Sequence, residues 1–113
     1  MLKLARVEAA LRAIADPRRR EILRLVADDE LPAGRIAAHF EVTRPAISQH
    51  LTVLKGAGLV TERRDGTRRL YRARPEGLAE LRGFLDEFWA DGLARLKTAA
   101  EHDERRNRRE RRR

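Results

Sequence analysis

The sequence predicts a mainly α-helical domain that carries one small β-hairpin. Apolar residues recur at helical spacing in five segments of the chain. Residues 59–74 instead hold two short runs around Asp65-Gly66, a pair that favours a tight hairpin turn. A length of 113 residues suffices for one hydrophobic core. We therefore expect one domain over residues 1–100, followed by an Arg-rich tail over residues 101–113.

Three helices are expected before residue 43. Residues 4–14 carry apolar side chains at helical spacing, which indicates a first amphipathic helix. Asp16 and Pro17 then supply the N-cap and the first-turn proline of a second helix, which ends at the acidic run that follows it. Pro32 opens a short third helix that reaches Phe40, and a tight turn comes next.

The fourth predicted helix runs from Thr43 to Ala57. As the N-cap, Thr43 can accept a hydrogen bond from a first-turn amide, and a proline is tolerated in that turn. Gly58 is expected to end the helix in the left-handed conformation. The apolar side chains of one face, which should pack inward, are Ile47, Leu51 and Leu54.

A hairpin and a long helix complete the expected elements. Strands are expected over residues 59–64 and 67–74, and the helix begins at Glu76. This helix carries a broad stripe of leucine and aromatic side chains. Because the preceding elements already fill one small core, we expect part of the stripe to contact another chain. The alternative is that the helix folds back on its own domain. The tail is expected to be a frayed helical extension or disordered.

Basic residues are concentrated in one part of the chain. The chain has 26 Lys and Arg against 18 Asp and Glu, a net charge of +8, and residues 41–75 hold eight of the basic and three of the acidic residues. Such a surplus inside an otherwise balanced domain is typical of a surface that faces phosphate. Chance clustering stays open on charge alone, because 39% of all residues are charged.

The composition excludes several classes of protein. The lack of Cys excludes a disulfide framework, a thiolate metal site and a cysteine nucleophile. With one serine and no Gly-rich phosphate loop, no nucleophile and base can be paired, so we expect no enzyme. His39, His50 and His102 lie on three different segments, so neither a metal nor a cofactor is expected. The apolar runs are too short for a membrane span or a signal peptide, and we expect a cytoplasmic protein.

Polar side chains gather on the outward face of the helix from Thr43 to Ala57. Ser48 and Gln49 are the only Ser and the only Gln of the chain, and both fall on this face. A helix that enters the major groove of duplex DNA needs such side chains, since Gln can bind an adenine edge and Arg a guanine edge. The alternative is an ordinary solvated face. The candidate DNA-binding residues of this helix are Thr43, Arg44, Pro45, Ser48, Gln49, His50, Thr52 and Lys55. Among them, His50 lies beside the inward face and is expected to be half-buried.

Arginines mark two further places in the chain. Those of the hairpin can grip phosphates or enter a narrow minor groove, although charge also protects edge strands. The candidate DNA-binding residues of the hairpin are Arg63, Arg64, Arg68 and Arg69. Residues 18–20 are arginines in the first turn of the second helix, where the helix dipole disfavours cations. We expect their compensation to come from a phosphate or from Asp16 and Glu21.

Three blocks of the sequence, residues 15–23, 43–51 and 54–60, resemble the signature segments of ArsR-type bacterial transcriptional regulators. The expected order of elements is that of a winged helix-turn-helix, and the resemblance covers roughly residues 5–97. It implies a homodimeric repressor that binds double-stranded DNA and releases its operator when an effector, often a metal ion, binds. We expect the homodimer to form through the first and last helices. The candidate interface residues are Leu4, Val7, Leu11, Phe88, Trp89, Leu93 and Leu96.

The sequence departs from the metal-sensing members that it resembles. Residues 33–38 offer no metal ligand. The last helix has Asp86, Glu87 and Asp91 but no histidine before His102. The chain therefore resembles the metal-independent branch, with no effector assigned. We predict a regulator that uses the helix from Thr43 to read a pseudo-palindromic operator, whose half-sites lie about 34 Å apart. The alternative is a sequence-neutral, nucleoid-type protein that coats nucleic acid.

Overall fold

The computed structural model describes the backbone of residues 2–112 and the side chains of residues 3–112. The chain divides into two compact units, which we call unit 1 (residues 1–81) and unit 2 (residues 82–113). None of the helices in the described part of the chain combines the length and the hydropathy that a bilayer crossing requires.

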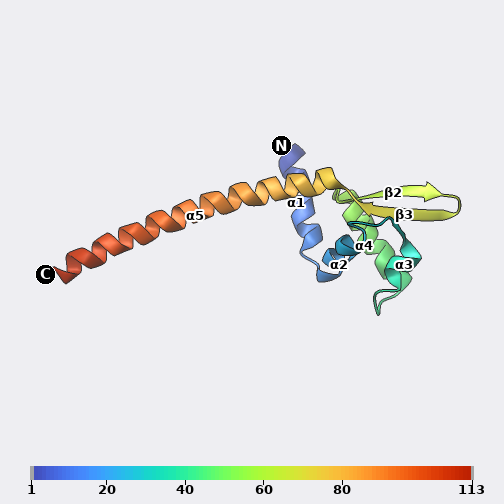
Figure 1. Cartoon of the computed structure of the whole chain (residues 1–113), viewed down its shortest axis with the longest axis horizontal. Helices are drawn as coiled ribbons and strands as arrows, with labels where there is room; N and C mark the ends of the chain where they lie inside the picture. Colours follow the sequence, from blue (N-terminus) through green and yellow to red (C-terminus); the bar gives the residue numbers. More distant parts are fainter. Residues whose placement is uncertain (1, 113) are drawn as a thin grey trace. The chain divides into compact units, whose positions relative to one another are not determined.

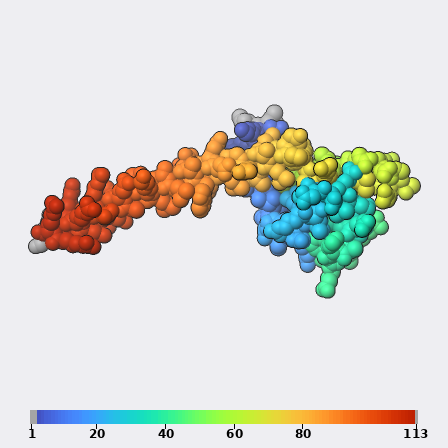
Figure 2. All heavy atoms as spheres, viewed as in Figure 1, coloured from blue at the N-terminus to red at the C-terminus, as the bar shows by residue number. Residues whose placement is uncertain are grey.

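Unit 1 contains four helices, a small sheet and the beginning of a fifth helix (Figure 1). The helices are α1 (Leu2–Ile14), α2 (Pro17–Leu25), α3 (Ala33–Ala37), α4 (Arg44–Gly56) and the first turns of α5 (Pro75–Arg111). The strands are β1 (Leu31–Pro32), β2 (Val60–Asp65) and β3 (Arg68–Ala73). The tip of the hairpin formed by β2 and β3 projects past the helices of unit 1 (Figure 2). The predicted fold class is confirmed.

The sheet has three antiparallel strands in the order β1-β3-β2, whereas the sequence predicted the hairpin alone. The added strand is only two residues long, and Pro32 in it pairs with Leu70 of β3. A proline has no N–H to donate, so it is accommodated in an edge strand. The predicted start of the third helix at Pro32 is therefore wrong by one residue, since Pro32 is the residue that precedes α3.

The hairpin turn also differs from the expectation by one residue. Asp65 and Arg68 are the last paired residues, so Gly66 and Thr67 form the turn in place of Asp65 and Gly66. Gly66 has φ +63°, and Thr67 does not have a positive φ. Glycine at the first central position is what a type II′ turn requires. The shift moves each partner by two positions along β3, so Arg64 pairs with Arg69 in place of Thr67, and the side chains that share a face stay the same.

The core of unit 1 is formed by α1, α2, α3, α4, the sheet and the first turns of α5. Its largest fully buried side chains are Ile22, Val26, Ile36, Ile47, Leu51, Leu54 and Leu59. Two backbone hydrogen bonds tie the end of β3 to the helices: Ala73 N donates to Val26 O at 2.9 Å and Arg74 N donates to Leu59 O at 2.8 Å. The burial of Ile47, Leu51 and Leu54 confirms the predicted inward face of α4, so the opposite face of this helix points away from the core.

The positive charges of the arginines at the start of α2 are stabilised by carbonyl groups of α1, which the sequence did not indicate. Arg19 Nε donates to Ala13 O at 2.8 Å, and Arg20 Nη1 donates to Ile14 O at 2.7 Å. These carbonyls belong to the last turn of α1, the negative end of its dipole, where cations are stabilising. Asp16 instead caps α2 by accepting from the Arg18 and Arg19 amides, and Glu21 pairs with Arg24.

Unit 2 is the continuation of α5 from Arg82. Large apolar side chains lie exposed along it, and the Phe84 and Phe88 rings stack with centroids 6.3 Å apart. The exposed large side chains of this unit are Leu85, Phe88, Trp89, Leu93 and Leu96. The helix continues through most of the Arg-rich segment and ends at Arg111, with ion pairs Asp103–Arg106 and Glu104–Arg108 on its surface.

Candidate nucleic-acid interface

Local signals at both ends determine where α4 begins and ends. Thr43 is the N-cap, and its Oγ1 accepts a hydrogen bond from Ala46 N at 3.3 Å. Pro45 lies in the first turn, where no intrahelical partner for its nitrogen is needed. Gly58, with φ +74°, follows the end of the helix, as predicted. The burial of one face then fixes which residues point away from the core.

The predicted polar face of α4 is open to solvent. Ser48, Gln49 and Thr52 are exposed, and the Thr52 hydroxyl donates to Ser48 O at 2.9 Å. Neither Ser48 nor Gln49 lies inside unit 1, so both are free to bind a ligand on this side. The other candidates of this helix that lie exposed are Thr43, Arg44, Pro45 and Lys55. His50 is half-buried, as expected.

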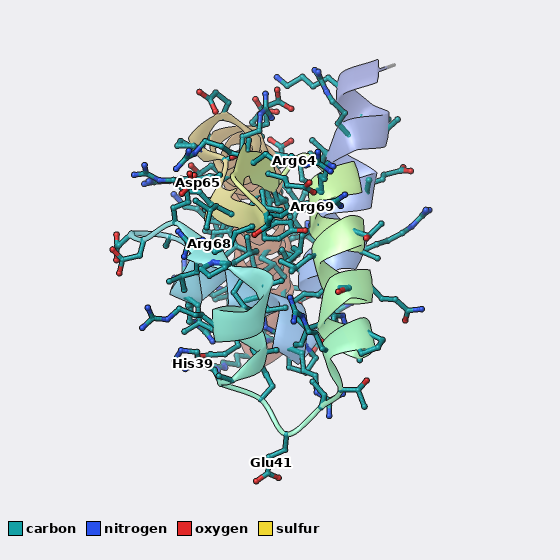
Figure 3. The ribbon with its side chains drawn as sticks, turned by 90° about the vertical axis from the view of Figure 1, so that its right-hand side faces the viewer. His39, Glu41, Arg64, Asp65, Arg68 and Arg69 are labelled. Carbon is teal, nitrogen blue, oxygen red and sulfur yellow. The ribbon has the colours of Figure 1, made fainter. Side chains whose placement is uncertain are left out.

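The register of the hairpin divides its four candidate arginines between two faces. Arg64 pairs with Arg69, and two positions further along the ladder Glu62 pairs with Tyr71, so these four residues share one face. Arg63 and Arg68 belong to the other face. In Figure 3, Arg64 and Arg69 lie on the side of α4, whereas Arg68 lies on the side of α3.

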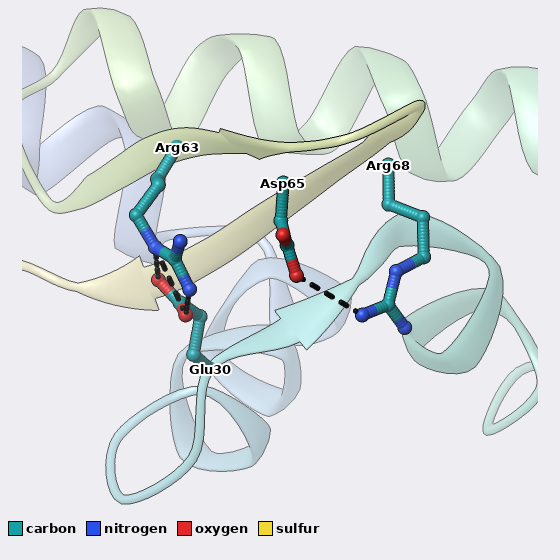
Figure 4. A network of polar contacts seen from close by, with 4 residues as sticks. All are labelled: Glu30, Arg63, Asp65 and Arg68. Atoms are coloured by element: carbon teal, nitrogen blue, oxygen red, sulfur yellow. Dashed lines mark hydrogen bonds and ion pairs between the residues drawn. The ribbon is translucent and has the colours of Figure 1, made fainter.

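Acidic side chains hold both arginines of the second face (Figure 4). Glu30, in the connection between α2 and β1, accepts two hydrogen bonds from Arg63 Nε at 3.0 and 3.2 Å, and a further one from Arg63 Nη2. Arg68 Nη2 donates to Asp65 Oδ2 at 3.3 Å. The hydrogen bonds from Arg63 hold the pKa of Glu30 below its ordinary value. Arg63 and Arg68 would thus have to exchange a carboxylate for a phosphate, whereas Arg64 has no acidic partner within 4 Å among the described residues.

A groove of about 890 Å³ lies between α4, α3 and the hairpin, entirely within unit 1. Its lining includes Ser48 and Thr52 of the polar face of α4 on one side and Tyr71 with the hairpin on the other. The basic side chains that line it are Arg35, Arg44, Lys55, Arg68 and Arg69. A groove with this charge and with hydrogen-bonding side chains along one wall suits a polyanion.

Glu62 connects the two walls of this groove and was not among the predicted site residues. Its Oε2 lies 3.1 Å from Lys55 Nζ of α4, and its Oε1 lies 3.5 Å from Arg69 Nε of β3. The hydrogen bond from Lys55 is the main reason that the pKa of Glu62 lies below its ordinary value. Burial, together with the charge of Glu62, raises the pKa of Tyr71. No sequence signal identifies this role, because Lys55 and Glu62 meet only through the packing of the hairpin on α4.

The candidate interface residues are placed differently in the two units. In α1, Leu4 is exposed, Leu11 packs partly against the core, and Val7 is only 3% exposed. Val7 therefore has almost no surface left for a partner chain. In unit 2 the candidates are largely exposed, and Trp89 has 64% of its surface free. Within residues 2–112, no cluster of three His, Cys, Asp or Glu side chains is placed to hold a metal ion.

Comparisons with known proteins agree with this geometry. The family described as "Bacterial regulatory protein, arsR family" matches residues 16–62. The HTH-type transcriptional regulator Rv2034 of Mycobacterium tuberculosis is 49% identical over 86 residues, which cover 76% of this chain and 80% of that protein. The transcriptional repressor SdpR of Bacillus subtilis is 46% identical over 55 residues, 49% of this chain and 61% of that protein. A structure of a homodimeric winged helix-turn-helix DNA-binding domain from Mycobacterium bovis, a possible ArsR-family regulator, superposes with a TM-score of 0.60 at 38% identity and covers 79% of each chain.

Proposed function

The chain belongs to the arsR family of bacterial regulatory proteins, and from this premise we propose that it is a homodimeric, sequence-specific repressor that binds double-stranded DNA. The observation that carries the proposal is the exposed polar face of α4, where Ser48 and Gln49 lie outward while the apolar face is held in the core. No catalytic role is part of the proposal. A regulator of this kind acts where the chromosome lies, which is the cytoplasm.

The N-terminal half of α4 would enter the major groove. Gln49 can bind an adenine edge through two hydrogen bonds, and Arg44 can bind a guanine edge in the same way. Ser48 can reach a base or a phosphate. Thr43, Pro45, His50, Thr52 and Lys55 would flank these contacts and fix the position of the helix on the backbone.

The hairpin would act as the wing that contacts the sugar-phosphate backbone. Arg64, which has no acidic partner within 4 Å among the described residues, is the best placed of its four candidate arginines, and Arg69, which pairs with Glu62, shares with it the face that adjoins α4. Arg63 and Arg68 remain candidates that must first release Glu30 and Asp65. Exposed ion pairs of this type contribute only about 0 to 1 kcal/mol, so a phosphate can replace the carboxylate at little cost.

Two copies of the chain would associate through α1 and α5. Unit 2 leaves several large apolar side chains exposed, which a single chain does not explain. The relative from Mycobacterium bovis is itself homodimeric. A homodimer presents two copies of α4, which requires half-sites about one helical turn apart and hence a pseudo-palindromic operator. In this proposal residues 1–100 form the DNA-binding and dimerisation domain, and residues 101–113 form its Arg-rich extension.

The proposal is tested by selecting duplexes from a randomised library with the full chain. The binding constant of the selected duplex is then compared with that of a scrambled duplex at one salt concentration. We expect a pseudo-palindromic sequence and a preference of about 1,000-fold or more. Footprinting of the DNA upstream of the chain's own coding region, with metal ions and with chelator, would then locate the operator. A preference near one would instead support sequence-neutral coating.

A further inference from the structure

Glu62 is the one acid among the described residues that line the groove, and it contacts a cation from each wall. Lys55 approaches one carboxylate oxygen from α4, and Arg69 approaches the other from β3. The carboxylate is thus a bridge between the helix proposed to read bases and the strand proposed to contact phosphates.

The bridge differs from an ordinary surface ion pair in its burial. The Glu62 side chain is 17% exposed, whereas those of Lys55 and Arg69 are 55% and 57% exposed. Beneath it Tyr71, which is 8% exposed, closes the side facing the core. The carboxylate is therefore held in place, and the two cationic side chains extend from it into solvent. Moving either cation away removes one of the two positive charges beside the half-buried carboxylate, so both cations favour positions next to Glu62.

This arrangement has opposite consequences for two kinds of DNA. Sequence-neutral binding depends on phosphates that cations can reach wherever the duplex lies. A duplex seated by base contacts of α4 would present its phosphates at fixed positions, and Lys55 and Arg69 would bind those that lie within reach while they stay paired with Glu62. A duplex that is not seated presents them elsewhere, so that the cations must first break their pairs with Glu62.

We propose that Glu62 is a specificity-determining residue, which restrains Lys55 and Arg69 so that they bind phosphate only on a duplex seated by α4. The inference rests on the proposed function and adds to it a residue that touches no base. Glu62 acts through the two cations and is a positioning residue.

The test compares E62Q with a control, E21Q. Both substitutions remove one negative charge from a carboxylate that pairs with a cation, but Glu21 binds Arg24 on α2, outside the groove and apart from the candidate DNA-binding residues. Binding constants for the selected duplex and for a scrambled duplex are measured over a range of salt concentrations. Thermal unfolding of each variant is recorded alongside, and E62D, which keeps the charge, serves as the conservative variant.

For E62Q we expect the affinity for the scrambled duplex to rise about fivefold, corresponding to two exposed ion pairs that no longer compete. Its salt dependence should steepen by up to about 1.8 per subunit, because each freed cation adds about 0.9. The affinity for the selected duplex should change by less than about twofold, so the preference falls. E21Q and E62D should keep the preference of the wild type.

An unchanged preference in E62Q would overturn the inference, as would an equal loss in E21Q, since total charge alone would then be responsible. A fall in both affinities together with a lower unfolding temperature would also overturn it, because it indicates a structural role. These results leave the proposed function intact, provided that the wild type discriminates between the duplexes. A wild type that binds both duplexes alike would overturn the proposed function and this inference together.

Discussion

Replacing Gly77 with alanine should destabilise unit 1, because the first turn of α5 lies directly against the residue that follows α4. A Cβ at position 77 would overlap the carbonyl oxygen of Gly58 and lie 3.0 Å from its carbonyl carbon. Ordinary contacts between carbon atoms lie near 3.5 to 4.0 Å, so the two backbones would have to move apart. Gly58 cannot yield easily, since its φ is +74° and its carbonyl oxygen accepts a hydrogen bond from Arg74 Nη1 at 3.3 Å.

The magnitude follows from two opposing effects. Overpacking of this kind costs about 1 to 3 kcal/mol, and more where backbone must shift. Alanine recovers up to about 1 kcal/mol of helix propensity. We expect a net loss of about 2 kcal/mol and a fall of about 10 °C in the unfolding temperature, measured by circular dichroism.

Gly83 provides the matched control for this substitution. It lies in the same helix, and a Cβ there meets no atom within 4 Å in the described structure. G83A should therefore be neutral or stabilise the helix by up to about 1 kcal/mol. If G77A unfolded at the same temperature as wild type, or if both alanine variants lost stability equally, the close contact between Gly58 and Gly77 would not limit the stability of unit 1.

Three further predictions concern binding, assembly and pH. Gln49→Ala should weaken binding of the selected duplex by about 1 to 3 kcal/mol and relax discrimination, whereas Arg64→Ala should weaken binding of the selected and scrambled duplexes alike. Fluorescence anisotropy with both duplexes measures these affinities, and equal losses for Gln49→Ala would exclude base reading. Alanine at both Phe88 and Trp89 should shift the dimer towards monomer in sedimentation, and an unchanged dissociation constant would place the interface elsewhere. Because the pKa of Glu62 is depressed in the folded chain, its carboxylate stabilises the fold at pH values above its ordinary pKa of 4.5, and this contribution is lost as pH falls through the pKa of the folded state. E62Q should therefore lose less stability than wild type between about pH 5 and pH 3. Equal losses would contradict the ion pairs assigned to Glu62.

The parts of the fold that the sequence predicted depend on neighbouring residues. Thr43, Pro45 and Gly58 act on the backbone within one turn of their own positions, and they give α4 the limits that were expected. The burial of Ile47 and its helical neighbours follows from spacing alone. The exposure of Ser48 and Gln49 is the complement of that burial, so the central part of the candidate site was predictable.

The remainder depends on contacts between distant residues. Arg63 and Glu30 lie 33 positions apart, and nothing in either segment indicates that they meet. The hairpin turn is one residue from its predicted place, so Arg64 pairs with Arg69 in place of Thr67, and composition does not show this register. Val7 has the spacing of an interface residue, yet it is covered by its own unit. These outcomes depend on packing between distant segments, which the local sequence pattern does not predict.

The two edge strands of the three-stranded sheet, β1 and β2, limit how copies of this chain can associate. At one edge, β1 is two residues long and ends in Pro32, which offers no N–H to an incoming strand. At the other edge, β2 carries the consecutive charges Glu62, Arg63 and Arg64. Neither edge is a good template for extending the sheet into a neighbouring molecule, even where many copies crowd along one duplex. Self-association is therefore directed to the helices, and the hairpin remains available to the nucleic acid.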